Sequence, residues 1–399
     1  KENDNRIALG RYGGPVALLR DDRKPVRLRP GEAHAPAIRV ASAAGHFLGR
    51  KAPSSNSNSV AGGSVPWTSG MVAGMAWTEE EDLVVVGATT GQAHVFPLEA
   101  FLEGGGDGGS RASPTSAAAR VLTLGADAAR DGVAAVAFWG DGLVAMTKCG
   151  ALVALDGFAD PRVELLQSPL TGLASAGPLP SPPPSSSLPN AAASSAPLFT
   201  TTTAPPLAVI PPAASPTGSP RAITASGRDI VVCDARSGSG GGSSKMTKAT
   251  MGAAVAAIAV SPCGGFVAAA DRDARLVVWS SDFSKALSEF ATQAATPPDA
   301  LAWCGSDSVV MLWKAAVAAA GGGSSGSGAG DFAPSLSSSS TGTPFAAADH
   351  SSESPSSSPS PSPRSLLLMV GPFGDWVKYD AAGVAALSTE PDGLRILSS

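Results

Sequence analysis

Short apolar runs separated by polar turns recur along the chain. The segment VAGMAWTEEEDLVVVGATTGQAHVF, residues 72 to 96, aligns without a gap on VAAIAVSPCGGFVAAADRDARLVVW, residues 255 to 279. Each copy predicts three strands joined by turns, and the third strand ends in an aromatic residue. Residues 133 to 155 repeat this pattern with shorter turns, and residues 301 to 313 repeat its first two strands.

This pattern indicates an antiparallel β architecture, because short strands follow one another at near-regular spacing without a helical repeat between them. A β-propeller fits best, since each of its blades packs only on its neighbours and tolerates long insertions at its edges. The copy at 255 to 279 also resembles a WD-repeat blade in its Ser-Pro-x-Gly-Gly turn, its Asp-rich turn and its final Val-Val-Trp. We expect an all-β propeller of six or seven WD-repeat-like blades, with an open or incomplete end blade as one alternative.

Tracts rich in Ser, Pro, Gly and Ala interrupt the strands. They contain few large apolar residues, so burial cannot offset the entropy cost of ordering them, and we expect disordered loops. The tracts are residues 53 to 65, 104 to 118, 168 to 206, 211 to 220, 237 to 250 and 320 to 364. Without them roughly 260 residues remain, enough for about six blades of ~40–45 residues. We expect residues 1 to 399 to form a single propeller domain interrupted by these loops.

Charge and reactive side chains argue against several classes of function. The net charge of −5 arises from acidic and basic residues mixed along the chain, so no general field attracts nucleic acid. The cysteines and histidines have neither metal-ligand spacing nor the spacing of a disulfide framework. They are Cys149, Cys233, Cys263, Cys304, His34, His46, His94 and His350. We expect reduced thiols of an intracellular protein, with no metal and no cofactor.

Only residues 251 to 270 have the length of a membrane span. Alanine supplies most of their hydrophobicity, and the central Ser261-Pro262-Cys263-Gly264-Gly265 predicts a turn between two strands. The N-terminal KENDNR lacks the apolar stretch of a signal peptide. We therefore expect neither a transmembrane segment nor a secretion signal.

Two glycine-rich patterns have functional spacing but lack the structural context that the function requires. GGGDGG, residues 104 to 109, has the spacing of a dinucleotide fingerprint without a flanking strand and helix. GGSSG, residues 322 to 326, has the spacing of a nucleophile elbow but lies in a Ser/Gly tract. We interpret both as chance matches and predict no catalytic residue.

Three further segments have both a chemical and a structural interpretation. Asp271-Arg272-Asp273 aligns with a turn of the other copy, so hairpin chemistry explains it without a metal ion. Glu79-Glu80-Glu81-Asp82 lies in another turn, where a solvated loop is favoured over catalytic carboxylates. The Ser-Pro-rich residues 351 to 364 are a candidate for phosphorylation.

The stretch RYGGPVALLR, residues 11 to 20, is compatible with a phosphate loop or with the entry into a strand. A phosphate loop needs converging backbone amides at a helix N-terminus. Pro15 has no amide hydrogen, and the apolar residues after it predict a strand. We therefore expect Gly13-Gly14 to form a tight turn and Pro15 to stand at the start of the strand.

Four motifs occur in an order that resembles a known family. The first is RYGGPVALLRDDRK, residues 11 to 24, and the second combines Trp67-Thr68-Ser69-Gly70 with MAWTEEEDL, residues 75 to 83. The third joins Leu287-Ser288-Glu289-Phe290 with Pro297-Pro298 and Ala302-Trp303-Cys304, and the fourth is EPDGLRIL, residues 390 to 397. Together they resemble the N-terminal domain of the vacuolar protein sorting-associated protein 16 family.

The resemblance implies a non-enzymatic subunit of the HOPS and CORVET tethering complexes. These complexes act in endosome-to-vacuole or lysosome transport and in SNARE-dependent membrane fusion. It implies a cytoplasmic protein that is peripheral on late endosome and vacuole or lysosome membranes, with other class C tethering subunits as partners. A Sec/Munc-type SNARE chaperone would bind through a C-terminal helical solenoid. That solenoid and an initial strand before the first motif are absent from this sequence, so we expect a fragment.

Two alternatives to the tethering subunit remain. The chain can be an unrelated WD-type β-propeller scaffold, for which the repeats alone would suffice. A propeller enzyme would need acids, histidines or metal ligands that converge on the central channel, and the sequence offers no such set. The sequence predicts no partner-binding residues.

Overall fold

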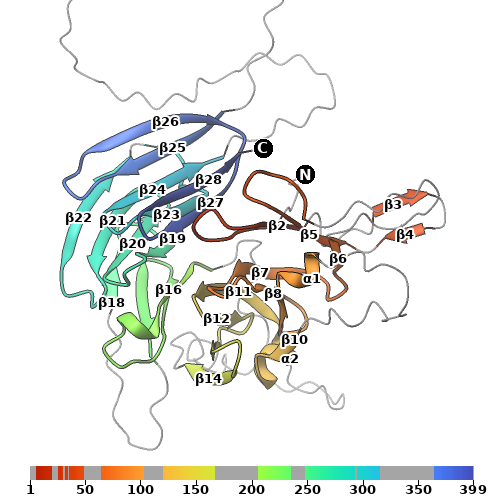
Figure 1. Cartoon of the computed structure of the whole chain (residues 1–399). Coiled ribbons are helices and arrows are strands. Elements are labelled where there is room, and N and C mark those ends of the chain that lie inside the picture. Colours follow the sequence, from red (N-terminus) through yellow and green to blue (C-terminus); the bar gives the residue numbers. More distant parts are fainter. Residues whose placement is uncertain are drawn as a thin grey trace, which may run out of the picture.

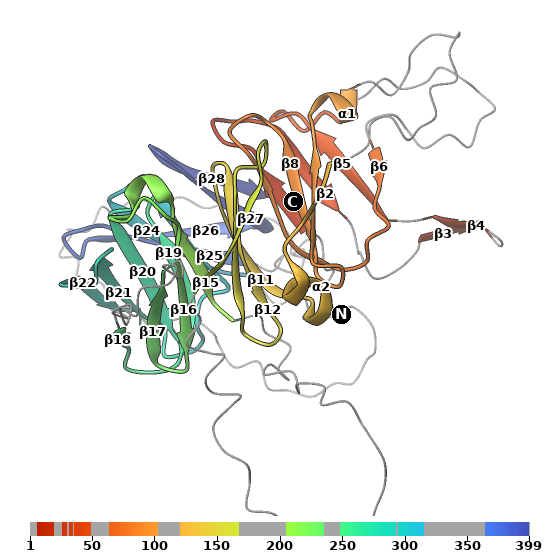
Figure 2. The same cartoon turned by 90° about the horizontal axis from the view of Figure 1, so that it is seen from below.

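The computed structural model describes ten stretches of the chain, namely residues 6–19, 26–29, 32–34, 36–48, 64–102, 120–166, 205–234, 248–292, 294–314 and 364–398. Six sheets of four antiparallel strands and one sheet of two strands follow one another in chain order. We number these sheets blade 1 to blade 7. Figures 1 and 2 show the blades arranged side by side from the N-terminus to the C-terminus.

The first four blades contain the N-terminal half of the chain. Blade 1 consists of β1 (Arg6–Leu9), β2 (Val16–Leu19), β5 (Ala37–Ala41) and β6 (Ser64–Pro66), with the hairpin β3 (Val26–Arg29) and β4 (Glu32–His34) inserted. Blade 2 consists of β7 (Val72–Trp77), β8 (Leu83–Gly87), β9 (Gln92–Phe96) and β10 (Arg120–Thr123). Blade 3 consists of β11 (Val133–Trp139), β12 (Gly142–Thr147), β13 (Leu152–Asp156) and β14 (Arg162–Leu166). Blade 4 consists of β15 (Leu207–Ile210), β16 (Arg221–Ser226), β17 (Asp229–Cys233) and β18 (Lys248–Thr250).

The last three blades differ in size. Blade 5 consists of β19 (Val255–Val260), β20 (Phe266–Asp271), β21 (Arg275–Ser280) and β22 (Ala286–Ala291). Blade 6 consists of β23 (Ala300–Cys304), β24 (Ser308–Trp313), β25 (Arg364–Val370) and β26 (Trp376–Ala382), and blade 7 only of β27 (Val384–Glu390) and β28 (Gly393–Ser398). The short helices α1 (Glu99–Leu102), α2 (Ala126–Asp131) and η1 (Pro212–Ala214) lie in connections.

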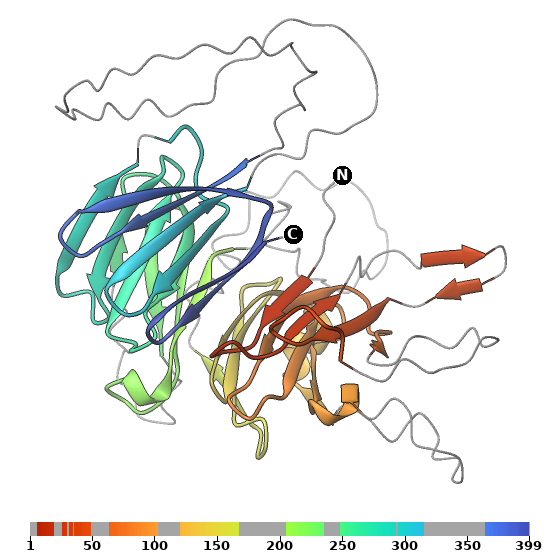
Figure 3. The ribbon, with the colours of Figure 1, turned by 45° about the horizontal axis from the view of Figure 1, so that its top comes forward.

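The first strand of each blade contacts the first strand of the next, from β1 through β7, β11, β15, β19 and β23 to β27. Strand β27 in turn contacts β1, so the ring is closed. The prediction of a β-propeller is therefore confirmed. Figure 3 shows β27 and β28, in dark blue, between the blue strands of blade 6 and the red strands of blade 1.

The repeats seen in the sequence are the blades themselves. Strands β7, β8 and β9 occupy the first copy, and β19, β20 and β21 begin at the aligned residues of the second. The second strand of a blade is sandwiched between two neighbouring blades, so both of its faces are covered. All residues of β8 and of β12 are accordingly buried, which explains their largely apolar sequences LVVVG and GLVAMT.

Apolar clusters between neighbouring blades form the core. Six such clusters join blade 1 to blade 2 and so on up to blade 7. Within the described residues, no cluster joins blade 7 to blade 1. Burial of apolar surface between blades is the main stabilising contribution in such a ring, and among the described residues the junction of blades 7 and 1 has no such cluster.

The low-complexity tracts differ in outcome. Residues 211 to 220 are not the disordered loop that we expected, because they form the turn between β15 and β16 and contain η1. Prolines restrict this turn, and Ala214 packs against the apolar cluster of blades 4 and 5. The other tracts lie mostly outside the described residues. Their described ends at 64–65, 205–206, 248–250 and Arg364 belong to strands or lead into one.

The one segment with the length of a membrane span is divided as predicted. Residues 251 to 270 contain β19, a turn and most of β20. In the described part of the chain, no helix combines the length and the apolar character that crossing a membrane requires.

Candidate functional site

The turns between the first and second strands of the blades form a ring, which we call the inner-turn ring. It consists of residues 10–15, 78–82, 140–141, 211–220, 261–265, 305–307 and 391–392. Neighbouring turns touch at several junctions. Arg11 pairs with Glu79, a Cβ added at Gly264 would meet Ala214, and the Gly305 amide donates to the Gly393 carbonyl next to the last turn.

The first turn of the ring has a geometry that its sequence dictates. Tyr12 and Gly13 both have positive φ, 52° and 71°, and the Gly14 amide donates to the Arg11 carbonyl over 2.8 Å. This is the pattern of a type I′ hairpin turn, which favours glycine. A Cβ on Gly14 would lie 2.8 Å from the Arg11 carbonyl oxygen, and β2 begins directly after Pro15. The predicted tight turn and strand entry are confirmed.

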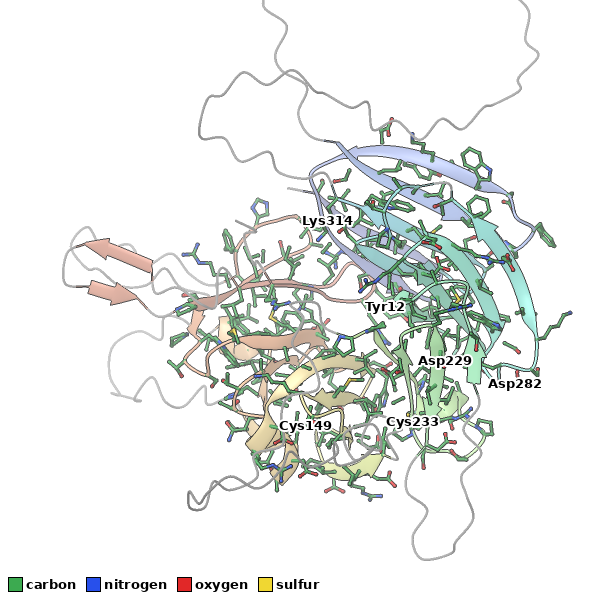
Figure 4. All side chains as sticks on the ribbon, turned by 180° about the vertical axis from the view of Figure 1, so that it is seen from behind. Tyr12, Cys149, Asp229, Cys233, Asp282 and Lys314 are labelled. Atoms are coloured by element: carbon green, nitrogen blue, oxygen red, sulfur yellow. The ribbon has the colours of Figure 1, made fainter. Side chains whose placement is uncertain are left out.

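This turn places Tyr12 in the open. Its side chain is 73% exposed although the residue lies beside the inner strands. Figure 4 shows Tyr12 near the middle of the molecule, between the two halves of the ring. An exposed tyrosine offers a large apolar surface and a hydrogen-bonding hydroxyl, which is the composition typical of protein contact sites.

A pocket of about 210 Å³ lies between the first turn and the turn of blade 2. Its walls are Gly10, Arg11, Tyr12, Gly14 and Pro15 on one side, and Trp77, Thr78, Glu79 and Glu81 on the other. The Trp77 indole donates to the Ala8 carbonyl over 3.3 Å, and Arg11 Nη1 lies 2.8 Å from Glu79 Oε1. These two contacts hold the turns of blades 1 and 2 at a fixed separation.

The turn on the blade 2 side of this pocket is acidic. Glu81 and Glu79, which Arg11 neutralises, line the pocket, while Glu80 and Asp82 belong to the same turn without lining it. Burial and then repulsion from Glu80 raise the pKa of the Asp82 carboxyl above its usual value. Accumulated negative charge of this kind favours a cationic ligand. The pocket is therefore suited to a partner that presents Lys or Arg beside an aromatic or apolar group.

Blade 7 supports the same turn from the opposite side. Arg395 Nη1 donates to the carbonyl oxygens of Gly10 and Gly14 over 2.7 and 2.9 Å. Hydrogen bonds from a charged donor are stronger than neutral ones. One guanidinium thus joins the end of the ring to its beginning.

The four family-like motifs meet at blade junctions. Arg11 of the first motif forms an ion pair with Glu79 of the second motif. The Gly14 carbonyl of the first motif accepts a hydrogen bond from Arg395 of the fourth motif. Trp303 of the third motif is buried between blades 5 and 6, and its amide donates to Thr389, next to the fourth motif. These residues therefore maintain the ring, which the sequence did not reveal.

The remaining candidate segments have the following outcomes. Asp271 is buried, and its carboxylate accepts hydrogen bonds from the backbone amides of Asp273 and Arg275. Hairpin chemistry therefore explains the Asp271-Arg272-Asp273 segment, as predicted. GGGDGG, GGSSG and residues 351 to 363 lie outside the described residues. Among the residues that the structure describes, no group of three or more His, Cys, Asp or Glu is placed to hold a metal ion.

Cys233, Cys263 and Cys304 are free thiols in different environments. Burial and then Asp234 raise the pKa of Cys233 to about 12, and burial and then Asp307 raise that of Cys304. Burial alone would raise the pKa of Cys263, but hydrogen bonds, chiefly with Ser261 and Ser306, lower it. Cys149 and Cys233 lie on different blades in Figure 4.

A serine-histidine pair that the sequence did not indicate joins the connection before β7 to strand β9. Ser69 Oγ lies 3.1 Å from His94 Nε2, and Trp67 packs edge-on against the imidazole. Burial lowers the pKa of His94, which favours the neutral ring. In the described part of the chain no carboxylate is hydrogen-bonded to His94, so the pair lacks the third member of a catalytic triad. The spacing of 25 residues gave no signal in the sequence.

Comparison with known proteins identifies relatives at low sequence identity. A family model for the Vps16 N-terminal region matches residues 224–329, which extend from β16 to beyond β24. "Protein VACUOLELESS1" of Arabidopsis thaliana is 23% identical over 407 aligned residues. The alignment covers 99% of this chain but 35% of that relative, so the chain spans about a third of the relative's length.

Solved structures share the fold at still lower identity. A chain in the crystal structure of the mitotic checkpoint complex has a TM-score of 0.51 at 14% identity and covers all of this chain and 85% of its own length. The β-propeller domain of Cps50 (Swd1) from Myceliophteria thermophila has a TM-score of 0.50 at 9% identity, covering 98% of this chain and 93% of its own length. At such identities these matches establish the β-propeller fold alone.

Proposed function

We propose that this chain is a member of the Vps16 N-terminal family and serves as the interaction propeller of a subunit of the class C tethering complexes HOPS and CORVET. The observation that carries the proposal is the Vps16 N-terminal match across blades 4 to 6. The four ordered motifs, which meet at blade junctions, support it over the rest of the ring. The proposed process is endosome-to-vacuole or lysosome transport with SNARE-dependent membrane fusion.

We propose a binding role rather than catalysis for the propeller. The inner-turn ring offers an exposed tyrosine and an acidic turn around a pocket. These groups suit recognition of a protein surface, with an aromatic anchor and charge complementarity. The Ser69–His94 pair is explained by packing against Trp67 and Phe96.

The proposed partners are the other class C subunits, and the proposed location is the cytoplasmic face of late endosome and vacuole or lysosome membranes. The name of the Arabidopsis relative refers to the vacuole, which agrees with this location. We place contact with a Sec/Munc-type SNARE chaperone outside the propeller, in the full-length gene product.

The test is affinity purification of the full-length gene product from its source cells, followed by mass spectrometry. We expect class C tethering subunits to be recovered with the bait. Recovery of an unrelated complex, without these subunits, would favour a WD-type scaffold from another pathway and contradict the proposal. A tagged propeller of unrelated family, expressed at the same level, controls for adhesion to the β surface.

A pair of variants tests the site itself. Tyr12→Ser removes the exposed aromatic side chain of the inner-turn ring. Asp282→Ser changes an exposed turn of blade 5. If the inner-turn ring contacts a subunit, Tyr12→Ser lowers recovery of that subunit severalfold and Asp282→Ser leaves it unchanged. Equal recovery with both variants would contradict this placement of the contact.

A further inference from the structure

The pocket between blades 1 and 2 has a strained residue on each of its walls. Tyr12 has a φ of 52° and Glu81 a φ of 63°, both in the left-handed region. Side chains are uncommon in this region because their Cβ atom crowds the backbone. Tyr12 stands at the first central position of its type I′ turn, where asparagine, aspartate or glycine is favoured. A large side chain and a carboxylate are therefore held at positions that suit glycine.

Blade 5 contains the same turn as blade 2 without this strain. In the alignment of the two copies Glu81 falls on Gly264, which has a φ of 69°. The Glu81 amide donates to the Thr78 carbonyl over 3.3 Å. The Gly264 amide donates in the same way to the Ser261 carbonyl over 2.8 Å. The turn itself thus forms with glycine and does not require the carboxylate of Glu81.

The other two left-handed side chains among the described residues are held by packing. Ala274 is fully buried, and the Phe283 ring lies 5.9 Å from the Trp279 ring. Tyr12 and Glu81 are exposed, and no described residue forms a hydrogen bond or an ion pair with either side chain. Burial therefore does not offset the strain at these two positions. Uncompensated backbone strain of this kind clusters at sites that bind ligands.

The pocket has the size and the charge for one basic side chain. Its volume of about 210 Å³ is below the ~300–1,000 Å³ of pockets that enclose a drug-sized molecule. Arg11 already pairs with Glu79, so the Glu81 carboxylate leaves the lining with a net negative charge. Arg395 bonds to backbone carbonyls from the blade 7 side and does not line the pocket. A cationic group is therefore favoured beside Glu81.

Arginine fits these walls better than lysine. A guanidinium is planar, so it can lie against the Tyr12 ring while it donates two hydrogen bonds to the Glu81 carboxylate. A lysine ammonium is a strongly hydrated point charge and gains less from either wall. Trp77, whose indole donates to the Ala8 carbonyl, adds apolar surface for the methylene groups of the arginine.

The described ends of the chain lie away from this pocket. Strand β1 reaches the inner-turn ring at Leu9, so Arg6 lies at its other end, on the opposite face of the propeller. Strand β28 leaves the ring at Gly393 and runs to Ser398 on that opposite face. The pocket faces solvent on the side of the inner turns, where Tyr12 is exposed (Figure 4).

We propose that this pocket binds a single arginine side chain of a partner protein, stacked on Tyr12 and paired with Glu81. The proposal rests on the binding role proposed for the inner-turn ring and names the residue that the ring recognises. Glu81 determines specificity for the charge, and Tyr12 for the planar group. The strain at both positions is maintained because glycine at either one would lose the contact.

Saturation-transfer NMR with the full-length protein tests the pocket, because this method detects weak ligands of large proteins. The probe is the tripeptide Gly-Arg-Gly with capped ends. We expect saturation transfer to its arginine side chain, with a dissociation constant on the order of 1 mM. The lysine tripeptide should bind roughly threefold more weakly. The citrulline tripeptide, which has the same shape without the charge, should not bind.

Matched variants locate the arginine. Glu81→Gly gives the turn the residue that blade 5 has, so the protein should fold while the tripeptide binds roughly tenfold more weakly. Tyr12→Ser should weaken binding roughly threefold through the lost cation–π contact. Asp160→Gly removes an exposed carboxylate from a turn of blade 3 and should leave binding unchanged. In affinity purification, Glu81→Gly should lower recovery of one partner severalfold, and Asp160→Gly should not.

Several results would overturn the proposal. They are the absence of saturation transfer to the arginine tripeptide, equal binding of the citrulline tripeptide, and binding that Glu81→Gly leaves unchanged. Unchanged recovery of every partner with Glu81→Gly would contradict the role of a partner's arginine. Binding that appears only after Arg50, Lys51 and Arg111 are replaced by serine would mean that the chain fills the pocket with its own basic residue.

These results are distinguishable from a failure of the proposed function. If the bait recovers class C subunits but the tripeptide does not bind, the arginine pocket is wrong and the tethering role stands. If the tripeptide binds and the bait recovers an unrelated complex that depends on Glu81, the tethering role is wrong and the arginine pocket stands.

Discussion

The junction of blades 5 and 6 and the junction of blades 7 and 1 hold the same ring together by different means. Trp303, Leu276 and Met311 belong to an apolar cluster between blades 5 and 6. Between blades 7 and 1, a single guanidinium bonds to the carbonyls of Gly10 and Gly14. The first junction depends on buried area, and the second on the geometry of a few polar atoms.

This difference between an apolar and a polar junction indicates where the ring can open. A buried apolar interface loses stability in proportion to the surface that becomes exposed, so partial separation is costly. A junction of few hydrogen bonds exchanges them for bonds to water, and its net contribution is smaller. We therefore expect fluctuations of the ring to concentrate at the junction of blades 7 and 1.

The largest expected effect tests the apolar junction. Trp303 is 2% exposed, and its indole donates to the Ala259 carbonyl of blade 5. Trp303→Ala should lower the free energy of unfolding by about 3–5 kcal/mol, measured by urea denaturation. Trp376→Ala, at a position that is 41% exposed, is the control and should have little effect. Equal losses would contradict the assigned role of burial.

The next effect tests the polar junction. Arg395→Ala removes the charged donor and leaves two carbonyls without it, which should cost about 1.5–3 kcal/mol. The loss should be local, so amides of β27, β28 and β1 should exchange hydrogen faster while those of blades 3 to 5 keep their rates. Arg162→Ala, which removes an exposed arginine of blade 3, should change neither. Uniformly faster exchange would show that the junction is not an independent opening point.

A smaller effect tests the turn that Arg395 supports. Gly14→Ala would place a methyl group 2.8 Å from the Arg11 carbonyl oxygen, and overpacking of this kind costs about 1–3 kcal/mol. Gly13→Ala meets no atom within 4 Å and should cost only the strain of positive φ, about 1–2 kcal/mol. Thermal unfolding of both variants measures the difference. A larger loss for Gly13→Ala would mean that backbone strain outweighs the close approach at Gly14.

The smallest effect concerns the acidic turn of blade 2. Burial and Glu80 raise the pKa of folded Asp82, so the ionised carboxylate destabilises the fold and protonation relieves this. Asp82→Asn should therefore be slightly more stable than the wild type at pH 7. The difference should shrink as the pH falls through the raised pKa, and vanish below the unfolded value of about 4. If the variant were still more stable than the wild type at pH 3, the gain in stability would come from packing and not from the charge of Asp82.

Much of the fold could be predicted from local patterns. Val72 and Val255 begin equivalent strands because each blade repeats the same alternation of apolar runs and turns. The contact of Arg395 with Gly14 could not be predicted, since it depends on the curvature of the whole ring rather than on neighbouring residues. For the same reason, no pattern in the chain indicated that Tyr12 and Glu79 would line one pocket. Residues 211 to 220 were misjudged because composition ignores the packing of Ala214.

The hydrogen bond between Arg395 and Gly10 joins residues 385 positions apart in the sequence. A ribosome adds residues at about 5–20 per second, so the first turn emerges long before the arginine that secures it. Blades 2 to 6 can each pack on the preceding blade as they are made, because their contacts are with neighbours. Ring closure must wait for β27 and β28. Until they have been made, a nascent chain leaves the blade 7 side of β1 uncovered, which makes that side a natural position for a chaperone.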